Sequence, residues 1–254
     1  MTARSLSWRV EETCFNAFPA LKQVLLGDWL MRFSNGVSRR ANSVNPLRAD
    51  CRAVADAIGA AERLYAAQGQ PTIFRVPTIA DASLDRELAD RGYASEGETC
   101  VIYGRIDAVP AASDPAVQLM PAPDAVWLSA MAALQGYDEA QAATYRRIVD
   151  AIAAEARFAL LTIDFAPAAL AYGVLHDGLL CYESVITDGA RRRQGLGRRL
   201  IASLAAWAHD SGAIGACLQV QADNTPARAL YGGFGLTTEL HRYHYRRAPV
   251  VVAG

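Results

Sequence analysis

The sequence predicts an α/β fold built from two similar halves. A repeat supports this prediction, because an offset of 143 residues (Gly212 minus Gly69) superimposes a long stretch of the first half on the second without gaps. A second observation is the Ala/Pro/Ser-rich segment VPAASDPA at 109–116, which has the composition of a connector. We therefore expect a first half at 1–108, a linker at 109–116 and a second half at 117–254.

The repeat consists of a helix, a strand and a short helix in each half. In the first half a helical pattern at 51–69 ends at a glycine, a strand follows at 71–81, and a short helix at 84–93. Under the offset these segments fall on 194–212, 214–224 and 227–236. The match is one of pattern more than of identity, and generic βαβ spacing also accounts for part of it.

The second half continues this alternation of helices and strands. We expect a strand at 117–119 and helices at 124–135 and 138–154, then strands at 157–163, 170–176 and 179–187. A helix at 198–211, a strand at 216–222, a short helix at 226–232 and a final strand or strand pair at 236–247 complete it. In the 198–211 helix one face is apolar and faces the core: Leu200, Ile201, Leu204, Ala205 and Ala208.

Composition excludes several classes of protein. The 254 residues carry a net charge of −1 and no low-complexity tract, so neither a nucleic-acid coat nor a disordered tail is expected. The N-terminus MTARSLSWRVEETCF lacks the apolar stretch and cleavage site of a signal peptide, and no segment approaches the roughly 20 apolar residues of a membrane span. We predict a cytoplasmic protein without nucleic-acid or membrane partners. No pattern predicts its oligomeric state.

The sequence predicts no metal site. The cysteines are odd in number and far apart, which favours reduced core residues over a disulfide framework or a zinc site: Cys14, Cys51, Cys100, Cys181 and Cys217. His241 and His244 lie three positions apart on a predicted strand, so their side chains point to opposite faces.

The segment RRRQGLGRRL at 191–200 lies at a strand-to-helix junction and predicts an anion site. The first N–H groups of a helix are unpaired, the helix dipole adds positive charge, and glycines allow close approach of a phosphate. A P-loop is excluded because no Lys-Ser/Thr ends the loop, and a dinucleotide fingerprint because its third glycine is missing. A flexible turn with solvated arginines is the alternative. A nucleic-acid surface is disfavoured, since no aromatic residues interleave the arginines.

These residues resemble the GCN5-related N-acetyltransferase (GNAT) superfamily. Its Arg/Gln-x-x-Gly-x-Gly/Ala signature is similar to Arg192-Arg193-Gln194-Gly195-Leu196-Gly197. A second family block resembles a set downstream: Asn224, Ala227, Tyr231, Gly235 and Leu236. The resemblance covers roughly 117–247, and the segment RRANSV at 39–44 together with the tandem arrangement resembles a bacterial subgroup. It implies two GNAT-like halves, each a mixed, mostly antiparallel sheet flanked by helices.

The resemblance implies acetyl-CoA as co-substrate. Its pyrophosphate would bind the amides of Arg193–Arg198, and its pantetheine would run along Val185–Thr187 in a V-shaped gap between the strands 179–187 and 216–222. An N–H near Val185–Thr187 would polarise the thioester carbonyl. Asn224 would hold the pantetheine or fix the strand end. The full expected cofactor-binding set is Val185, Ile186, Thr187, Arg192, Arg193, Gln194, Gly195, Leu196, Gly197, Arg198, Asn224 and Tyr231.

Two residues are expected to move protons. Glu183 is the candidate base for the ammonium of the substrate, because strand alternation puts it on the same face as Val185. An exposed strand residue, or one that only binds substrate or orders a water, is the alternative. The resemblance implies that the Tyr231 hydroxyl protonates the leaving CoA thiolate; a packing tyrosine is the alternative.

The first half departs from the family where the chemistry is. Under the offset, Gly195 and Gly197 correspond to Arg52 and Val54, Asn224 to Asp81, and Tyr231 to Leu88. Side chains at the glycine positions block a phosphate, and leucine has no proton to give. We therefore expect 1–108 to be a degenerate GNAT-like domain without a CoA site, and 117–254 to be the catalytic domain.

The resemblance thus implies an N-acetyltransferase that moves acetyl from acetyl-CoA to a primary amine of a small molecule or peptide, by direct attack in a ternary complex. Three other activities stay open: a non-catalytic acyl-CoA-binding sensor or interaction module, transfer to a hydroxyl, and a larger acyl donor. The residues that would select the acceptor carry no motif.

Overall fold

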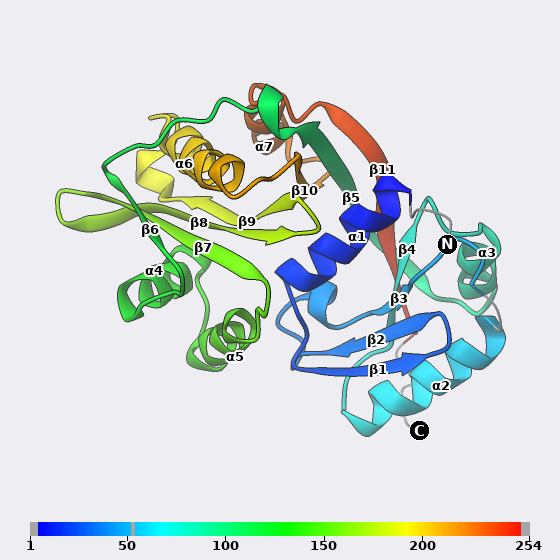
Figure 1. Ribbon diagram of the computed structural model, residues 1–254. Coiled ribbons are helices and arrows are strands. Elements are labelled where there is room, and N and C mark those ends of the chain that lie inside the picture. The colour runs from blue at the N-terminus through cyan, green and yellow to red at the C-terminus, as the bar shows by residue number, and fades with distance from the viewer. Residues whose placement is uncertain (1–4, 52–53, 250–254) are drawn as a thin grey trace. The chain divides into compact units, whose positions relative to one another are not determined.

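The chain folds into two compact units, as a computed structural model that describes residues 5–51 and 54–249 shows (Figure 1). Unit 1 contains the described residues up to Pro19 together with Ile102–Val220 and Asn224–Glu239. Unit 2 contains Ala20–Val101, Gln221–Asp223 and the described residues from Leu240 onward. These boundaries differ from those expected at 108 and 117, because the N-terminal helix groups with the second half and the C-terminal strand with the first.

Long-range contacts explain both exchanges. Helix α1 (Leu6–Ala17) packs on β8 (Ala166–His176) and β9 (Leu179–Thr187), and the Tyr172 hydroxyl donates a hydrogen bond of 3.0 Å to the carbonyl of Ala17. Strand β11 (Thr238–Arg247) pairs antiparallel with β4 (Ile73–Pro77) from Tyr243 opposite Pro77 to Arg247 opposite Ile73. Contacts between residues so far apart in the chain leave no trace in local periodicity.

Unit 1 contains a mixed, mostly antiparallel sheet, as predicted. Its strands lie in the order β10–β9–β8–β7–β6, with β6 at Val117–Met120, β7 at Glu155–Ile163 and β10 at Gly215–Gln221. All neighbours in this order are antiparallel except β9 and β10, which are parallel. The segments 179–187 and 216–222, between which a V-shaped gap is expected, therefore correspond to the parallel pair β9–β10.

Helices cover both faces of the unit 1 sheet (Figure 1). On one face lies α6 (Leu196–Asp210); on the other lie α4 (Ala125–Gln135) and α5 (Glu139–Asp150). Successive residues of β8 illustrate the alternation. The ring of Tyr172 lies 6.2 Å from that of Trp127 in α4, whereas a side chain at Gly173 would contact Leu204 and Trp207 of α6.

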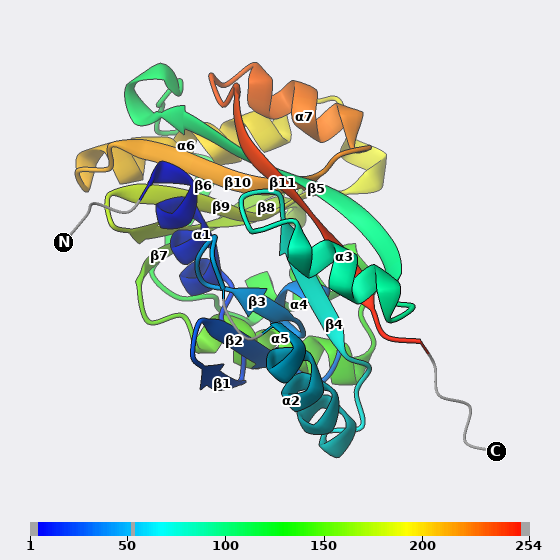
Figure 2. The same cartoon turned by 90° about the vertical axis from the view of Figure 1, so that its right-hand side faces the viewer.

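Unit 2 contains a run of paired strands and a core. Its strands lie in the order β1–β2–β3–β4–β11, with β1 at Lys22–Leu26, β2 at Trp29–Phe33 and β3 at Val44–Pro46. The helices are α2 (Val54–Ala67) and α3 (Ser83–Asp90), which Figure 2 shows with β4, and β5 follows at Ala94–Arg105. The core is apolar and aromatic, and its largest members include Trp29, Tyr65, Phe74 and Tyr93.

The repeat is confirmed at the level of secondary structure. Adding 143 to the bounds of α2, β4 and α3 gives 197–210, 216–220 and 226–233; α6, β10 and α7 (Thr225–Gly232) occupy 196–210, 215–221 and 225–232. Gly69 and Gly212, which follow the long helices, have φ angles of +64° and +81°, the left-handed conformation that favours glycine after a helix.

Several predictions for the second half need correction, among them the start of β8, which lies at Ala166 rather than 170. Helix α6 begins at Leu196, two residues before the expected start, because Gly195 in the left-handed region acts as its N-cap. Helix α5 ends at Asp150 rather than 154, because β7 already begins at Glu155 and the chain has to turn between them. The C-terminal segment forms the single strand β11 rather than a pair.

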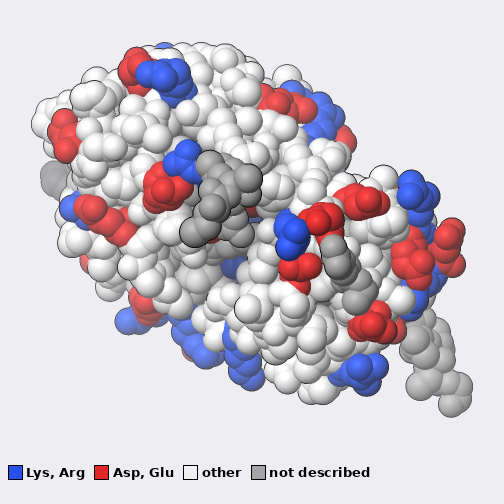
Figure 3. All heavy atoms as spheres, turned by 45° about the vertical axis from the view of Figure 1, so that its right-hand side comes forward, with Lys and Arg blue, Asp and Glu red and all other residues white. Residues whose placement is uncertain are grey.

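The exterior carries charges of both signs. Lys and Arg side chains alternate with Asp and Glu over the face shown in Figure 3, in keeping with the net charge of −1. Among residues 5–51 and 54–249, no helix combines the length and the apolar character that crossing a membrane requires.

Candidate active site

The loop before α6 leaves a helix N-terminus open to a ligand. Gly195 is the N-cap residue with φ +76°, and no side chain caps the helix. The first intrahelical bond runs from Arg199 N to Gly195 O at 3.2 Å, so the N–H groups of 196–198 have no intrahelical acceptor. The first turn contains no acidic residue. This end of α6 therefore keeps the positive field that attracts an anion.

The arginines of the loop divide into two groups. Arg191 pairs with Asp164 at 3.1 Å and Arg199 with Asp114 at 2.5 Å. Arg192 and Arg193, with Gln194 beside them, are exposed, and within the described part of the chain no carboxylate pairs with either guanidinium. The outer arginines thus fix the loop, and the two exposed ones stay available to a ligand.

The predicted linker is docked on α6. The Asp114 carboxylate accepts hydrogen bonds from Nε and Nη2 of Arg199. The backbone N–H of Asp114 donates to the Ser203 hydroxyl at 3.3 Å. A pocket of about 510 Å³ lies between this segment and α6, and its lining includes Arg198, Arg199 and Phe234. The guanidinium carbon of Arg198 lies 4.7 Å from the ring centroid of Phe234.

Strands β9 and β10 pair over a short stretch only. Their register pairs join Gly215 to Leu179, Ala216 to Leu180 and Cys217 to Cys181. Although β9 continues to Thr187 and β10 to Gln221, no register pair joins their described residues beyond Cys181 and Cys217. Beyond this point β9 is paired with β8 alone, so one backbone edge of Val185–Thr187 has no strand partner.

A β-bulge interrupts β9 beside Glu183. Tyr172 pairs with Glu183 and Leu170 with Ile186, so two residues of β9, Ser184 and Val185, lie opposite one residue of β8. Ser184 has φ +51°, which is uncommon for a residue other than glycine. Strand alternation, which predicts that Glu183 and Val185 share a face, does not hold across this bulge.

Helix α5 holds the bulge. The hydroxyls of Ser184 and Tyr145 share a hydrogen bond of 2.9 Å, and Tyr145 is buried. Neither Ser184 nor Tyr145 was predicted as a site residue. Serine at 184 carries no strand or turn signal that marks a bulge, and the helical spacing of Tyr145 identifies only a buried face.

Glu183 is a buried carboxylate, only 3% exposed. Its Oε1 lies 4.0 Å from the Sγ of Cys181, which lies on the same face of β9 two residues earlier. Burial rules out the alternative of an ordinary exposed strand residue. A buried carboxyl close to an open sheet edge is a candidate for proton transfer to or from a ligand bound there.

Tyr231 lies on α7 and is also buried, at 8% exposed. Burial first, and then the charge of Glu183, raises the pKa of the Tyr231 phenol well above its usual value. The two predicted proton-transfer residues are therefore electrostatically coupled. At neutral pH Tyr231 carries its proton.

Gly197 lies where β9, α6 and α7 approach one another. A Cβ built at this position would lie 3.4 Å from Leu230 Cδ2 and 3.8 Å from Thr187 Oγ1. The side chain of Leu196 beside it is buried and anchors the helix start. The structure thus brings the arginine loop next to the end of β9 and to the helix that carries Tyr231.

Asn224 is the N-cap of α7. Its side-chain oxygen accepts a hydrogen bond of 3.1 Å from the backbone N–H of Ala227, and Pro226 lies in the first turn. This role differs from the expected contact with pantetheine or the strand end. The side chain is exposed, and its amide NH₂ group is not used by the cap.

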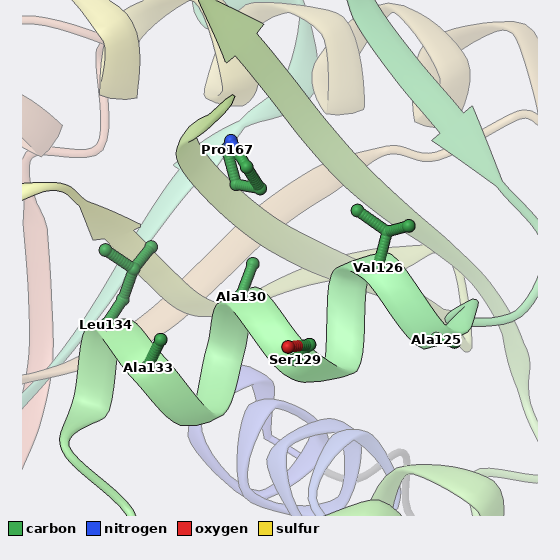
Figure 4. Close-up of a pocket in the computed structure, with 7 residues that line it drawn as sticks. All are labelled: Ala125, Val126, Ser129, Ala130, Ala133, Leu134 and Pro167. Atoms are coloured by element: carbon green, nitrogen blue, oxygen red, sulfur yellow. The ribbon is translucent and has the colours of Figure 1, made fainter. Parts of the chain in front are cut away.

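A second apolar pocket lies on the α4 side of the unit 1 sheet (Figure 4). Its volume is about 500 Å³. None of its lining residues is a predicted site residue, although Pro167 is two residues from Ala169, which pairs with Thr187. The lining consists of Ala125, Val126, Ser129, Ala130, Ala133, Leu134 and Pro167.

Comparisons with known proteins identify the family. The profile of the family described as "Probable histone acetyltransferase Rv0428c C-terminal" matches residues 7–246. A Bacillus subtilis (strain 168) protein named "Uncharacterized N-acetyltransferase YobR" is 26% identical over 242 residues, which cover 94% of this chain and 97% of that protein.

Solved structures show the same fold. The GCN5-related N-acetyltransferase from Kribbella flavida superimposes with a TM-score of 0.73 at 16% identity and covers 98% of each chain. A tandem GNAT protein from the clavulanic acid biosynthesis pathway gives a TM-score of 0.61 at 15% identity, covering 79% of this chain and 71% of that one. The chain belongs to the family whose profile it matches, and it is an acyltransferase of the GNAT N-acetyltransferase superfamily.

Proposed function

We propose that unit 1 binds acetyl-CoA and transfers its acetyl group to a primary amine of a small molecule or peptide, in a ternary complex. The observation that carries this proposal is the open N-terminus of α6, with exposed Arg192 and Arg193 beside the end of β9. A helix N-terminus without cap or carboxylate, next to an unpaired strand edge, fits a ligand that has both a pyrophosphate and an extended amide chain.

Binding would use the backbone first. The N–H groups of Leu196, Gly197 and Arg198 donate to the pyrophosphate, and the exposed guanidinium groups of Arg192 and Arg193 add charge-assisted bonds. Val185–Thr187 pair with the pantetheine amides along the edge that β10 leaves open. The side-chain NH₂ group of Asn224 is a further candidate donor to acetyl-CoA.

The β-bulge supplies a donor for the thioester carbonyl. A bulged residue is left out of the strand ladder, so an N–H at Ser184 or Val185 is free to donate to an oxygen on which negative charge develops. The hydrogen bond between Ser184 and Tyr145 holds this backbone in place before substrate binds. Such preorganisation lowers the cost of reaching the transition state.

Glu183 and Tyr231 would complete the proton balance. Glu183 accepts a proton from the substrate ammonium, and the free amine nitrogen then forms its bond to the carbonyl carbon. The C–S bond breaks, and Tyr231 donates its proton to the departing thiolate. The raised pKa of the Tyr231 phenol disfavours its phenolate, which is reprotonated by the second proton that the nitrogen loses as it becomes an amide, and Glu183 returns its proton to solvent.

Gly195→Asp tests the proposal. The carboxylate lies where the pyrophosphate would bind, and like-charge repulsion of several kcal/mol predicts a loss of acetyl-CoA affinity on the order of 100-fold or more. Gly195→Asn is the matched control. Asp and Asn both tolerate a positive φ, and a Cβ at 195 meets no atom within 4 Å, so both variants should fold.

Calorimetry with acetyl-CoA, and a thiol-release assay over amino acids, polyamines, aminoglycosides and peptides, are the measurements. We expect Gly195→Asn to bind within about threefold of the wild type, since it adds no charge. Equal affinity of the wild type and a folded Gly195→Asp protein would refute the binding site. Tight binding without thiol release for any amine would refute transfer to amines.

A further inference from the structure

Three cysteine side chains of unit 1 converge although they are far apart in the chain. Cys14 comes from α1, Cys181 from β9 and Cys217 from β10, and their Sγ atoms all lie within 4.8 Å of one another. Cys181 and Cys217 are register partners, and the Sγ atoms of Cys14 and Cys181 are 3.8 Å apart. All three side chains are less than 5% exposed.

The other two cysteines provide an internal comparison. None of the five cysteines forms a disulfide in the structure. Cys100 is as buried as the three, and Cys51 is half-buried, yet among the described residues neither belongs to a cluster of this kind. Burial of single cysteines as small apolar residues accounts for Cys100 but not for the convergence of thiols from three elements.

The sulfur distances distinguish between two kinds of chemistry. A disulfide needs two sulfurs at about 2.05 Å and would leave the third thiol over. Thiolates bound to one tetrahedral Zn²⁺ at about 2.3 Å each lie about 3.8 Å apart. The distance of 3.8 Å between Cys14 and Cys181 equals the second value, and the remaining separations, at most 4.8 Å, need only a small contraction.

We propose that Cys14, Cys181 and Cys217 form a binding site for a thiophilic divalent cation of the Zn²⁺ class. Sulfur-only donor sets favour such soft or borderline ions over Mg²⁺ and Ca²⁺, which require oxygen. The predicted absence of a metal site rested on the sequence separation of the cysteines, and the fold removes that separation.

The Glu183 carboxylate is the nearest fourth ligand. Its Oε1 lies 4.0 Å from the Sγ of Cys181, whereas a sulfur and an oxygen on one tetrahedral Zn²⁺ lie about 3.6 Å apart. Glu183 does not belong to the group whose ligand atoms all lie within 4.8 Å of one another, so its side chain would have to rotate toward the other two sulfurs to complete four ligands. If Glu183 is the base of the proposed transfer, a cation here inhibits turnover; this consequence rests on the proposed function, and the site itself does not.

Cation binding must displace thiol protons. The neighbouring Cys14 thiol, ahead of burial, raises the pKa of both Cys181 and Cys217 well above the usual value for cysteine. A thiol that binds the cation as thiolate releases its proton, so binding should acidify an unbuffered solution.

The experiment is a titration of the reduced full-length chain with Co²⁺, followed by displacement with Zn²⁺. We expect one equivalent of Co²⁺ to produce the absorption of thiolate-to-cobalt charge transfer. Cys14→Ser and Cys217→Ala should each weaken binding by more than the about 10- to 100-fold typical of losing an outer-shell partner. Cys51→Ser and Cys100→Ala are the matched controls and should bind like the wild type.

Folding is checked by circular dichroism, and a variant that does not fold is replaced by the other substitution at the same position. Absence of charge-transfer absorption in the wild type would overturn the site. Binding that persists in folded variants at 14 and 217, or that disappears in Cys51→Ser, would also overturn it. None of these readouts depends on acetyl transfer, so failure of the site and failure of the proposed activity are distinguishable.

Discussion

Helices α6 and α2, which correspond to each other in the repeat, differ in the charges at their N-termini. Helix α6 of unit 1 begins after Gly195 in the left-handed conformation, and its first turn contains no acidic residue. Helix α2 of unit 2, its counterpart in the repeat, begins at Val54 and carries Asp56 in its first turn. Arg52, the counterpart of Gly195, lies outside the described residues. In α2 a carboxylate already complements the helix dipole, whereas in α6 that position is left for a ligand.

The short helices α7 and α3 begin in the same way and differ farther along. Asn224 and Asp81 both accept a hydrogen bond from a backbone N–H at a helix start, Ala227 at 3.1 Å and Ser83 at 2.7 Å. Seven residues on, Tyr231 presents a hydroxyl, whereas Leu88 is fully buried in the unit 2 core. The capping interactions that shape the fold occur in both units, and the groups suited to chemistry occur in unit 1 alone.

The largest effects are expected from substitutions at the two matched positions, Tyr231 in unit 1 and Leu88 in unit 2. Tyr231→Phe keeps the ring and removes a hydroxyl that has no hydrogen-bond partner among the described residues, so folding and acetyl-CoA affinity should be unchanged. Turnover should fall about 100- to 10,000-fold, the usual contribution of a general acid. Steady-state kinetics and calorimetry on the same preparation check both expectations.

Leu88→Ala should show the opposite pattern. A leucine buried at 0% exposure loses about 2–5 kcal/mol of the free energy of unfolding when it is truncated, while the folded fraction keeps wild-type affinity for acetyl-CoA. Denaturant unfolding and calorimetry measure the two quantities. If Tyr231→Phe destabilised the protein and left turnover intact, Tyr231 would be a packing residue like Leu88, and the comparison would fail.

A smaller, pH-dependent effect is expected for Glu183→Gln. Glutamine keeps the shape of the side chain but accepts no proton, so the loss of turnover, about 100-fold, should be greatest below neutral pH, where free amine is scarce. Acetyl-CoA affinity should be unchanged. The measurement is the pH profile of kcat/KM, and identical profiles for variant and wild type would leave Glu183 without a role in proton transfer.

Much of the architecture could be predicted because it is written in local patterns. The apolar face of α6 at Leu200, Leu204 and Ala208, and the glycines that follow α2 and α6, are readable in one window of sequence. The offset of 143 residues then transfers the order of elements from one unit to the other. The helices and strands that were predicted lie within about four residues of their observed bounds, whereas several elements of the first 105 residues were not predicted: α1, β1, β2, β3 and β5.

What the sequence could not predict depends on contacts between distant residues. The packing of α1 on β9, the pairing of β11 with β4 and the bulge at Ser184 have no local signal, since each is decided by a partner elsewhere in the chain. For the same reason the cluster of Cys14, Cys181 and Cys217 could not be predicted from the sequence. The candidate proton-transfer residues Glu183 and Tyr231 were named from a family resemblance and, for Glu183, from strand alternation; the structure adds their burial and the electrostatic interaction between them.

The smallest effect is expected from Val54→Asp in unit 2, the counterpart of an added carboxylate at Gly197. Val54 is half-buried at the first position of α2, next to the turn that already contains Asp56. A further carboxylate there faces no ligand if unit 2 lacks a CoA site, so acetyl-CoA affinity should stay within about threefold of the wild type. Any cost should appear in the free energy of unfolding only, because a half-buried apolar side chain is replaced by a charge.

Calorimetry with acetyl-CoA on the folded Val54→Asp variant is the test. A loss of affinity comparable with that of Gly195→Asp would mean that α2 also binds the cofactor, and that the two units differ less than their helix N-termini indicate.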